Sequence, residues 1–201
     1  MTVPTTARGA RTRTALVAAA RTVFERDGFT DSRIVDITRE AGCATGSFYT
    51  WFASKAEILS AVLYEAQREV IVPRLDPDAA DPFKELAEGH RQYFENYRRN
   101  ASLMLVLEEV AAVDPAFRKV RRRRGEALAR KTAAVIAQMQ ARGLADPSLD
   151  PYPTARALDG MVSHLAYYAF VLGDDLDLDT LTATTDQIWR NALGSGAPAS
   201  P

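Results

Sequence analysis

The sequence predicts an all-α fold: an amino-terminal three-helix domain with a helix-turn-helix, followed by a larger carboxy-terminal helical bundle. Apolar residues recur at helical spacing along most of the 201-residue chain, and no stretch alternates between apolar and polar residues as a strand would. An apolar share of 47% and a charged share of 25% are ordinary for a globular protein that can bury more than one core. We expect domains at 1–53 and 54–193, with a disordered tail at 194–201.

The first helix is expected to begin near Arg13 and to end at Asp27. Its apolar residues fall on one stripe, as the four-residue spacing of Ala20 and Phe24 illustrates. Gly28 follows directly and can adopt the left-handed conformation that ends a helix.

The next two helices are short and are joined by a tight turn. Ser32 can cap the first of them, which should run to Glu40, because its hydroxyl can accept a hydrogen bond from a free backbone N–H. The turn follows at 41–43, and the second short helix is expected at 44–52. Two short helices around a glycine-containing turn form a helix-turn-helix, whose second helix enters the major groove of DNA. The sequence therefore predicts double-stranded DNA as a partner.

The second short helix has the two faces that groove binding requires. Phe48 and Phe52 lie four residues apart and should plug into the domain core, so that small polar residues point outward. Thr and Ser can bond base edges or touch a thymine methyl, whereas Tyr, Trp and Lys suit phosphate oxygens, which fix register without reading sequence. The predicted DNA-binding residues are Arg33, Ala44, Thr45, Gly46, Ser47, Tyr49, Thr50, Trp51 and Lys55.

Two assignments in this domain keep an alternative. Trp51 could pack inside the small domain instead of contacting a phosphate. Arg8, Arg11 and Arg13 make segment 1–13 basic, either as an arm that reaches the DNA or as a flexible, solvated start. The net charge of −1 does not by itself indicate nucleic-acid binding, so any positive face has to come from the distribution of charges.

Ser54 opens the fourth helix with a capping box, since Glu57 follows three residues later. This box aims the positive helix start, with Lys55, toward a position where a phosphate could lie. The helix is expected to fray near 72–73, where a loop rich in proline and aspartate begins and extends over 73–82.

The rest of the chain keeps helical periodicity up to residue 193. Asp114 and Pro115 restart the chain, because Asp caps a helix and Pro fits its first turn. A second loop that contains prolines is expected at 143–153. The helices of this part are expected at 82–99, 101–113, 115–142, 154–172 and 178–193.

The run from Arg13 to Leu63 resembles the amino-terminal domain of the TetR family of transcriptional regulators. Two positions depart from the family's pattern. Ala44 stands where a Ser usually opens the recognition helix, which removes a cap worth about 1 kcal/mol. Arg33 stands where a small hydroxylated residue is common, and it could contact a phosphate or a guanine. The positions that carry the resemblance are Leu16, Ala19, Ala20, Phe24, Gly28, Phe29, Ile37, Ala41, Gly42, Gly46, Phe48, Tyr49, Phe52, Lys55 and Leu59.

The resemblance implies a homodimer that binds a small-molecule effector in the carboxy-terminal bundle. The helices at 154–172 and 178–193 would pair with their copies as a four-helix bundle, so that two recognition helices read a palindromic operator. Repression is also what the resemblance implies.

The effector pocket is expected among aromatic, methionine and polar residues on the middle of the bundle helices. Such pockets are mostly apolar with a few placed polar groups. Glu108 and His164 stand out because an unpaired polar group inside a bundle is costly, although His164 could face the dimer partner and the others could be plain core. The predicted effector-binding residues are Tyr93, Phe94, Tyr97, Met104, Leu107, Glu108, Met139, Met161, His164, Tyr167 and Tyr168.

Other kinds of site have little support in the sequence. The single cysteine, Cys43, excludes an intrachain disulfide and a CxxC metal site. We expect it to fill a small apolar space, because a redox sensor would need a lowered thiol pKa. No metal-ligand cluster, Gly-rich phosphate loop or nucleophile motif is evident, so we expect no catalytic residue, no metal and no cofactor. The basic run at 118–124 spreads over more than one helix face and should be solvated, paired partly with Glu126, although it could meet anionic ligands.

The expected setting is the cytoplasm, without a membrane partner. No apolar run approaches the roughly 20 residues that span a bilayer, and residues 1–10 have no apolar core of signal-peptide type. The expected function is a ligand-responsive, DNA-binding regulator, a homodimeric repressor released from its operator by a small apolar or aromatic molecule. The alternatives are an enzyme that acts on its ligand, and a small-molecule binding protein of the same fold without operator binding, which Ala44 favours.

Overall fold

The computed structural model describes residues 6–68 and 81–194. The helix end near 72–73, most of the loop at 73–82 and the tail beyond residue 194 lie outside these residues. Every regular element within them is helical, in agreement with the all-α prediction. The chain divides into two compact units, Met1–Glu69 with Ser102–Asp114, and Val70–Ala101 with Pro115–Pro201. The functional boundary expected between residues 53 and 54 stays a prediction.

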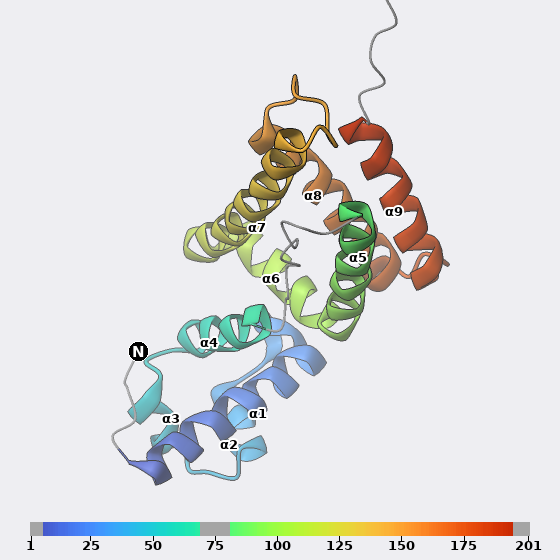
Figure 1. Ribbon diagram of the computed structural model, residues 1–201. Coiled ribbons are helices and arrows are strands. Elements are labelled where there is room, and N and C mark those ends of the chain that lie inside the picture. Colours follow the sequence, from blue (N-terminus) through green and yellow to red (C-terminus); the bar gives the residue numbers. More distant parts are fainter. Residues whose placement is uncertain (1–5, 69–80, 195–201) are drawn as a thin grey trace, which may run out of the picture. The chain divides into compact units, whose positions relative to one another are not determined.

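In the first unit, α1 (Ala7–Asp31) packs against α2 (Ile34–Glu40) and α4 (Lys55–Arg68), while α2 packs against α3 (Thr45–Trp51) (Figure 1). Helix α6 (Ala101–Val113) is grouped with this unit. Burial of large apolar side chains is the main stabilising contribution to such a small bundle. Its buried apolar residues include Leu16, Val23, Phe24, Ile37, Phe48, Phe52, Ile58, Leu59, Val62 and Leu63.

Helix α1 begins earlier than the sequence predicts. Thr6 is its N-cap, and the Thr6 hydroxyl accepts a hydrogen bond from the backbone N–H of Gly9 (3.1 Å). Arg8, Arg11 and Arg13 are therefore helical, so that from Thr6 onward the basic segment is not a flexible arm. Apolar periodicity could not reveal these first turns, because they carry no large apolar residue.

At the end of α1, the prediction for Gly28 is confirmed and the prediction for Ser32 is not. Gly28 interrupts the helix as expected, with a φ of 72° and a ψ of 179° that glycine adopts without strain, and the chain continues to Asp31. Ser32 was predicted to cap α2, which is wrong: Ser32 is buried and its hydroxyl donates to the carbonyl of Phe29 (2.9 Å). Arg33 occupies the N-cap position of α2 without a side-chain cap hydrogen bond.

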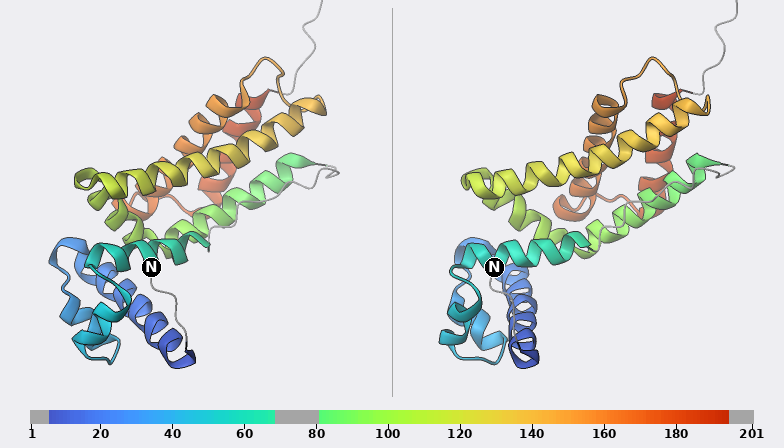
Figure 2. Two further views of the ribbon diagram at one scale, coloured as in Figure 1. Left: turned by 90° about the vertical axis from the view of Figure 1, so that its left-hand side faces the viewer. Right: turned by 60° about the vertical axis from the view of Figure 1, so that its left-hand side comes forward.

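The second unit contains two packed pairs of helices. Helix α5 (Pro82–Arg99) packs against α9 (Leu178–Leu193), and α7 (Pro115–Ala141) packs against α8 (Pro151–Tyr167) (Figures 1 and 2). A π-helical turn, η1 (Tyr168–Leu172), continues α8. The largest buried side chains of its core are Phe94, Ile136, Met139, Leu158 and Trp189.

Most helix bounds in this unit follow the prediction, and α8 is the exception. It begins at Pro151, not at Thr154, because the Asp150 carboxylate accepts a hydrogen bond from the N–H of Tyr152 (3.2 Å). Asp150 and Pro151 thus repeat the Asp-Pro start that Asp114 and Pro115 make, and the expected loop is shorter. Among the described residues, no helix combines the length and the apolar content that crossing a membrane requires.

Candidate functional site

The turn between α2 and α3 is closed by backbone hydrogen bonds. The N–H of Gly42 donates to the carbonyl of Arg39 (3.1 Å), and the N–H of Cys43 donates to the carbonyl of Thr38 (3.0 Å). This pair of bonds is a Schellman motif, and it requires the left-handed conformation that Gly42 adopts with a φ of 63°. The turn therefore fixes the direction in which α3 leaves α2, as a helix-turn-helix requires.

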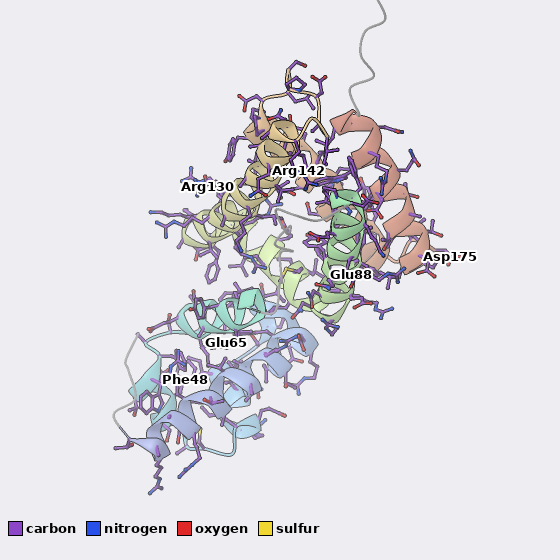
Figure 3. The ribbon with its side chains drawn as sticks, viewed as in Figure 1. Phe48, Glu65, Glu88, Arg130, Arg142 and Asp175 are labelled. Carbon is purple, nitrogen blue, oxygen red and sulfur yellow. The ribbon has the colours of Figure 1, made fainter. Side chains whose placement is uncertain are left out.

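Helix α3 and its end have the two faces that the sequence predicts. Phe48, labelled in Figure 3, and Phe52 are buried in the first unit with their ring centroids 5.8 Å apart. The opposite face holds hydroxyl groups and a phenol, and α3 itself contains no carboxylate that would repel a phosphate. The exposed residues of this face are Thr45, Gly46, Tyr49 and Thr50.

Two further predicted residues flank this face. Ala44 is the N-cap of α3 and makes no side-chain cap hydrogen bond. The hydroxyl of Thr45 lies 3.4 Å from that of Thr38, so the two helices are also linked through side chains. Ser47 is half-buried and thus less open than Thr45.

The first turns of α1 pack beside the end of α3. Gly9 faces the indole of Trp51 so closely that a Cβ at Gly9 would lie 2.9 Å from its Cη2 atom. The Arg13 guanidinium lies 5.4 Å from the ring centroid of Phe52. This geometry favours the packing role for Trp51. It also places the exposed Arg8 and Arg11 on helical turns next to α3, where their charge raises the local positive potential.

Lys55 is engaged inside the protein, and the phosphate contact that the sequence predicts for it stays untested. Its ammonium donates to the carbonyls of Phe29, Thr30 (3.2 Å) and Ser32 (2.6 Å), and it lies 4.6 Å from the ring centroid of Phe29. An ammonium has three N–H donors, and all three are used. Burial lowers the pKa of Lys55, while the charge of Asp31 acts in the opposite direction. Lys55 therefore ties the end of α1 to the start of α4.

Arg33 is held by a carboxylate on its own helix. Its guanidinium donates twice to Asp36 (2.8 and 3.1 Å), and Arg39 donates to the same carboxylate (3.1 Å). The hydrogen bond from Arg33 holds the pKa of the Asp36 carboxyl below its usual range. The Arg33 side chain is still 71% exposed, so a contact with DNA would require it to exchange one acceptor for another.

The remaining features of this unit are structural. The first half of the predicted capping box forms, since the Ser54 hydroxyl accepts from the N–H of Glu57 (3.2 Å). The Glu57 carboxylate accepts from the N–H of Ala53 (2.7 Å), one residue before the capping serine. Burial raises the pKa of the Cys43 thiol, which is opposite to the shift that a redox sensor needs. Within residues 6–68 and 81–194, no three His, Cys, Asp or Glu side chains are grouped to hold a metal ion.

The second unit contains a cavity between its helices. The space open to the centres of water molecules is about 60 Å³. Because a water takes up roughly 30 Å³ in the liquid, this space corresponds to about two waters. The cavity is partly open to solvent, so a larger ligand can extend beyond it. Its lining residues are Leu86, Gly89, His90, Tyr93, Leu128, Thr132, Val135, Asp159, Val162 and Trp189.

The polar groups of the cavity come from four helices. Asp159 on α8 accepts a hydrogen bond from the Thr132 hydroxyl on α7 (3.0 Å), and burial raises the pKa of its carboxyl to about 6. The Nδ1 atom of His90 on α5 lies 2.6 Å from a carboxylate oxygen of Asp186. The rings of His90 and Trp189 meet edge to face with centroids 4.7 Å apart.

The cavity differs from the predicted effector site. Of the predicted residues, only Tyr93 is among those that line it, where burial raises the pKa of its phenol. Phe94 and Met139 are core residues, and Tyr97 and Met161 pack against that core. The other predicted residues lie on α6, which is grouped with the first unit, or on the outer side of α8 and η1; they are Met104, Leu107, Glu108, His164, Tyr167 and Tyr168.

His164 lies away from this cavity. It is exposed, and its ring centroid lies 4.8 Å from that of Tyr168, which is also exposed. Of its two predicted roles, exposure fits the contact with a dimer partner better than a place inside the bundle. Among the cavity residues that were not predicted, Asp159 has a recognisable sequence pattern. Asp159 follows the apolar Leu158 and precedes Val162 by three positions, so a carboxylate sits at the edge of the apolar stripe of α8.

Comparison with known proteins agrees with this architecture. Residues 16–62 match the profile of "Bacterial regulatory proteins, tetR family". The A-factor receptor protein of Streptomyces griseus is 27% identical over 193 residues, which cover 94% of this chain and 65% of that protein. The chain thus spans less than two thirds of the length of this relative.

Two other similarities cover nearly the whole chain. The HTH-type transcriptional regulator EthR of Mycolicibacterium smegmatis is 22% identical over 195 residues, which cover 92% of this chain and 87% of that protein. A crystal structure of a TetR-family transcriptional regulator from Mesorhizobium loti superposes with a TM-score of 0.79 at 21% identity, over 94% of this chain and 98% of the other. At this identity the superposition shows a shared fold.

Proposed function

We propose that this chain, which belongs to the TetR family of transcriptional regulators, is a homodimeric repressor that a small molecule releases from a palindromic operator. That the chain is a DNA-binding regulator follows from the family itself. The dimer, the response to a ligand and the sign of regulation are the parts of this account that we propose. The relatives it matches are regulators, and we propose no catalytic activity.

The observation that carries the proposal is the open face of α3. Its apolar side chains are buried, while Thr45 and Thr50 are exposed and Tyr49 keeps 59% of its surface open to solvent. Hydroxyl groups of this size can reach base edges in the major groove, and a phenol can donate to a phosphate. The basic first turns of α1 lie beside this helix and add charge that attracts the DNA backbone.

A second copy of the chain is supported by apolar surface on the last helices. Tyr152, Tyr168, Leu172 and Ile188 are large apolar residues of α8, η1 and α9 that remain exposed. Covering such residues in a two-fold interface would stabilise a dimer. Dimerisation would also double the recognition contacts, since a single short helix contacts few base pairs.

Release by a ligand needs only a modest coupling between cavity and DNA-binding domain. A ligand that prefers the state with mismatched recognition helices by about 1–3 kcal/mol would weaken operator binding about 5- to 150-fold. The name of one relative, the A-factor receptor protein, supports a receptor role for this chain as well. A regulator of this kind works in the cytoplasm, where the DNA lies.

The test is a mobility shift of DNA from the region upstream of the gene, carried out over a series of salt concentrations. The proposal expects saturable binding to one palindromic site, with an affinity that falls steeply as salt rises. Weak binding that ignores sequence, both for this DNA and after selection from random DNA, would favour the alternative of a ligand-binding protein without an operator. The uncapped start of α3 at Ala44 is the observation that favours that alternative.

A further inference from the structure

Two residues that line the cavity of the second unit carry buried polar atoms that no described residue satisfies. Trp189 is 3% exposed, and its indole N–H has no hydrogen-bond partner among residues 6–68 and 81–194. The Oδ2 atom of Asp159 is likewise buried without a partner there, while its Oδ1 atom is engaged by Thr132. Both residues line the cavity. Buried polar atoms without partners are costly, so a molecule that satisfies both is favoured over one that satisfies neither.

The two atoms require opposite chemistry from a ligand. An indole N–H can only donate and therefore needs an acceptor, whereas an ionised carboxylate oxygen can only accept and needs a donor. An ammonium group offers donors alone, so it would leave the indole of Trp189 without an acceptor. A carboxylate offers acceptors alone and would be repelled by Asp159. An uncharged group with a donor next to an acceptor satisfies both.

The surroundings reinforce the preference for an uncharged ligand. Arg156 acts on the Asp159 carboxyl electrostatically, so a cationic ligand would meet a positive charge already in place. The apolar walls, formed by residues such as Leu86, Val135 and Val162, favour a hydrocarbon body. His90, held by Asp186, packs against the indole of Trp189 and fixes its ring plane.

We propose that the cavity binds a small, mainly apolar and uncharged molecule with an amide-like group, whose N–H or O–H donates to Asp159 and whose carbonyl accepts from Trp189. This inference rests on the proposed function, because it assigns a ligand class to the cavity through which that regulator would be released. Thr132 is then a positioning residue, which holds the other carboxylate oxygen so that Oδ2 faces the ligand.

Calorimetric titration of the full chain with three small probes of similar size tests the assignment. Benzamide offers a donor and an acceptor, acetophenone has the same shape with the acceptor alone, and benzylammonium has donors alone. At pH 8, where Asp159 is ionised, we expect benzamide to bind at least about tenfold more tightly than either of the others.

Two variants locate the effect, with a matched control. Asp159→Asn replaces one carboxylate oxygen by an NH2 group, and with the remaining oxygen still held by Thr132 the NH2 takes the place of Oδ2. This variant should therefore remove the preference for benzamide over acetophenone, whereas Trp189→Phe should weaken the binding of both probes. Asp175→Asn, at an exposed position labelled in Figure 3, should change neither. Thermal unfolding of each variant shows whether it is folded. If Trp189→Phe does not fold, the probe preference of Asp159→Asn still tests the ligand class.

The outcomes separate this inference from the proposed function. Equal binding of benzamide and acetophenone, a preference for benzylammonium, or no binding of any probe would overturn the ligand class, even if the protein binds an operator. Selective binding of benzamide by a protein that binds no specific DNA would support the ligand class and contradict the repressor.

Discussion

Replacing Lys55 by methionine removes a charge that joins two helices of the DNA-binding unit. The ammonium donates to three carbonyls at the end of α1 and lies over the ring of Phe29. A hydrogen bond from a charged donor contributes about 1.5–3 kcal/mol, but Thr30 is exposed and water can replace part of what is lost. We therefore expect Lys55→Met to lower the free energy of unfolding of this unit by about 2–4 kcal/mol, with little packing lost because the apolar stem remains.

Urea unfolding followed by circular dichroism measures this change, and Lys131→Met, at an exposed position of α7, is the matched control. The same two variants are then titrated onto DNA in a salt series at a temperature where both are folded. If Lys55 neutralised a phosphate instead, stability would hardly change, and the slope of log affinity against log salt would fall by about 0.9 for each subunit. That result would refute the account of Lys55 as an internal tie.

Three further predictions concern other parts of the chain. Gly42→Ala should lower the stability of the first unit by about 1–2 kcal/mol, because Gly42 has a φ of 63°. Gly46→Ala should raise it by up to about 1 kcal/mol, because Gly46 is helical and a Cβ there meets no other atom; urea midpoints measure both changes. Asp159→Asn should stabilise the protein above pH 6, because the pKa of the Asp159 carboxyl is about 6 in the folded protein and lower in the unfolded chain. The ionised carboxylate then lowers the free energy of unfolding by roughly 2–4 kcal/mol above that pH and has no such effect below about pH 3, which unfolding over a pH series measures. Leu172→Asp should shift a dimer to monomers in analytical ultracentrifugation, whereas Val113→Asp should not, and equal sedimentation of the two would count against the proposed interface.

The helix-turn-helix was predictable because its determinants are local. The glycine-containing turn and the four-residue spacing of Phe48 and Phe52 are visible between neighbours in the sequence, and both are present in the structure. The internal contacts of Lys55 were not predictable because its partners are 23 to 26 residues away, at the interrupted end of α1. A sequence shows that a lysine opens a helix, but not that a kink at Gly28 brings backbone carbonyls to it.

The cavity of the second unit was much less predictable for a related reason. Helical spacing shows that Phe94 and Trp189 lie on the apolar faces of their helices. It does not show which part of a buried face packs against the core and which part borders a cavity. Which of them borders empty space depends on how α5, α7, α8 and α9 pack. Large aromatic residues were expected there, yet most of those fill the core or remain at the surface, while smaller residues such as Gly89 and Thr132 line the space.

The measurement that tests the central claim most directly compares two tyrosines of equal exposure. Tyr49 on α3 is 59% exposed and Tyr64 on α4 is 60% exposed, so their replacement by alanine perturbs the fold to a similar extent. Fluorescence anisotropy on the operator should show that Tyr49→Ala loses about tenfold or more in affinity, roughly 1.4 kcal/mol or above, while Tyr64→Ala binds as the parent protein does. Equal affinity of the two variants, or a larger loss for Tyr64→Ala, would contradict the assignment of α3 as the helix that meets DNA.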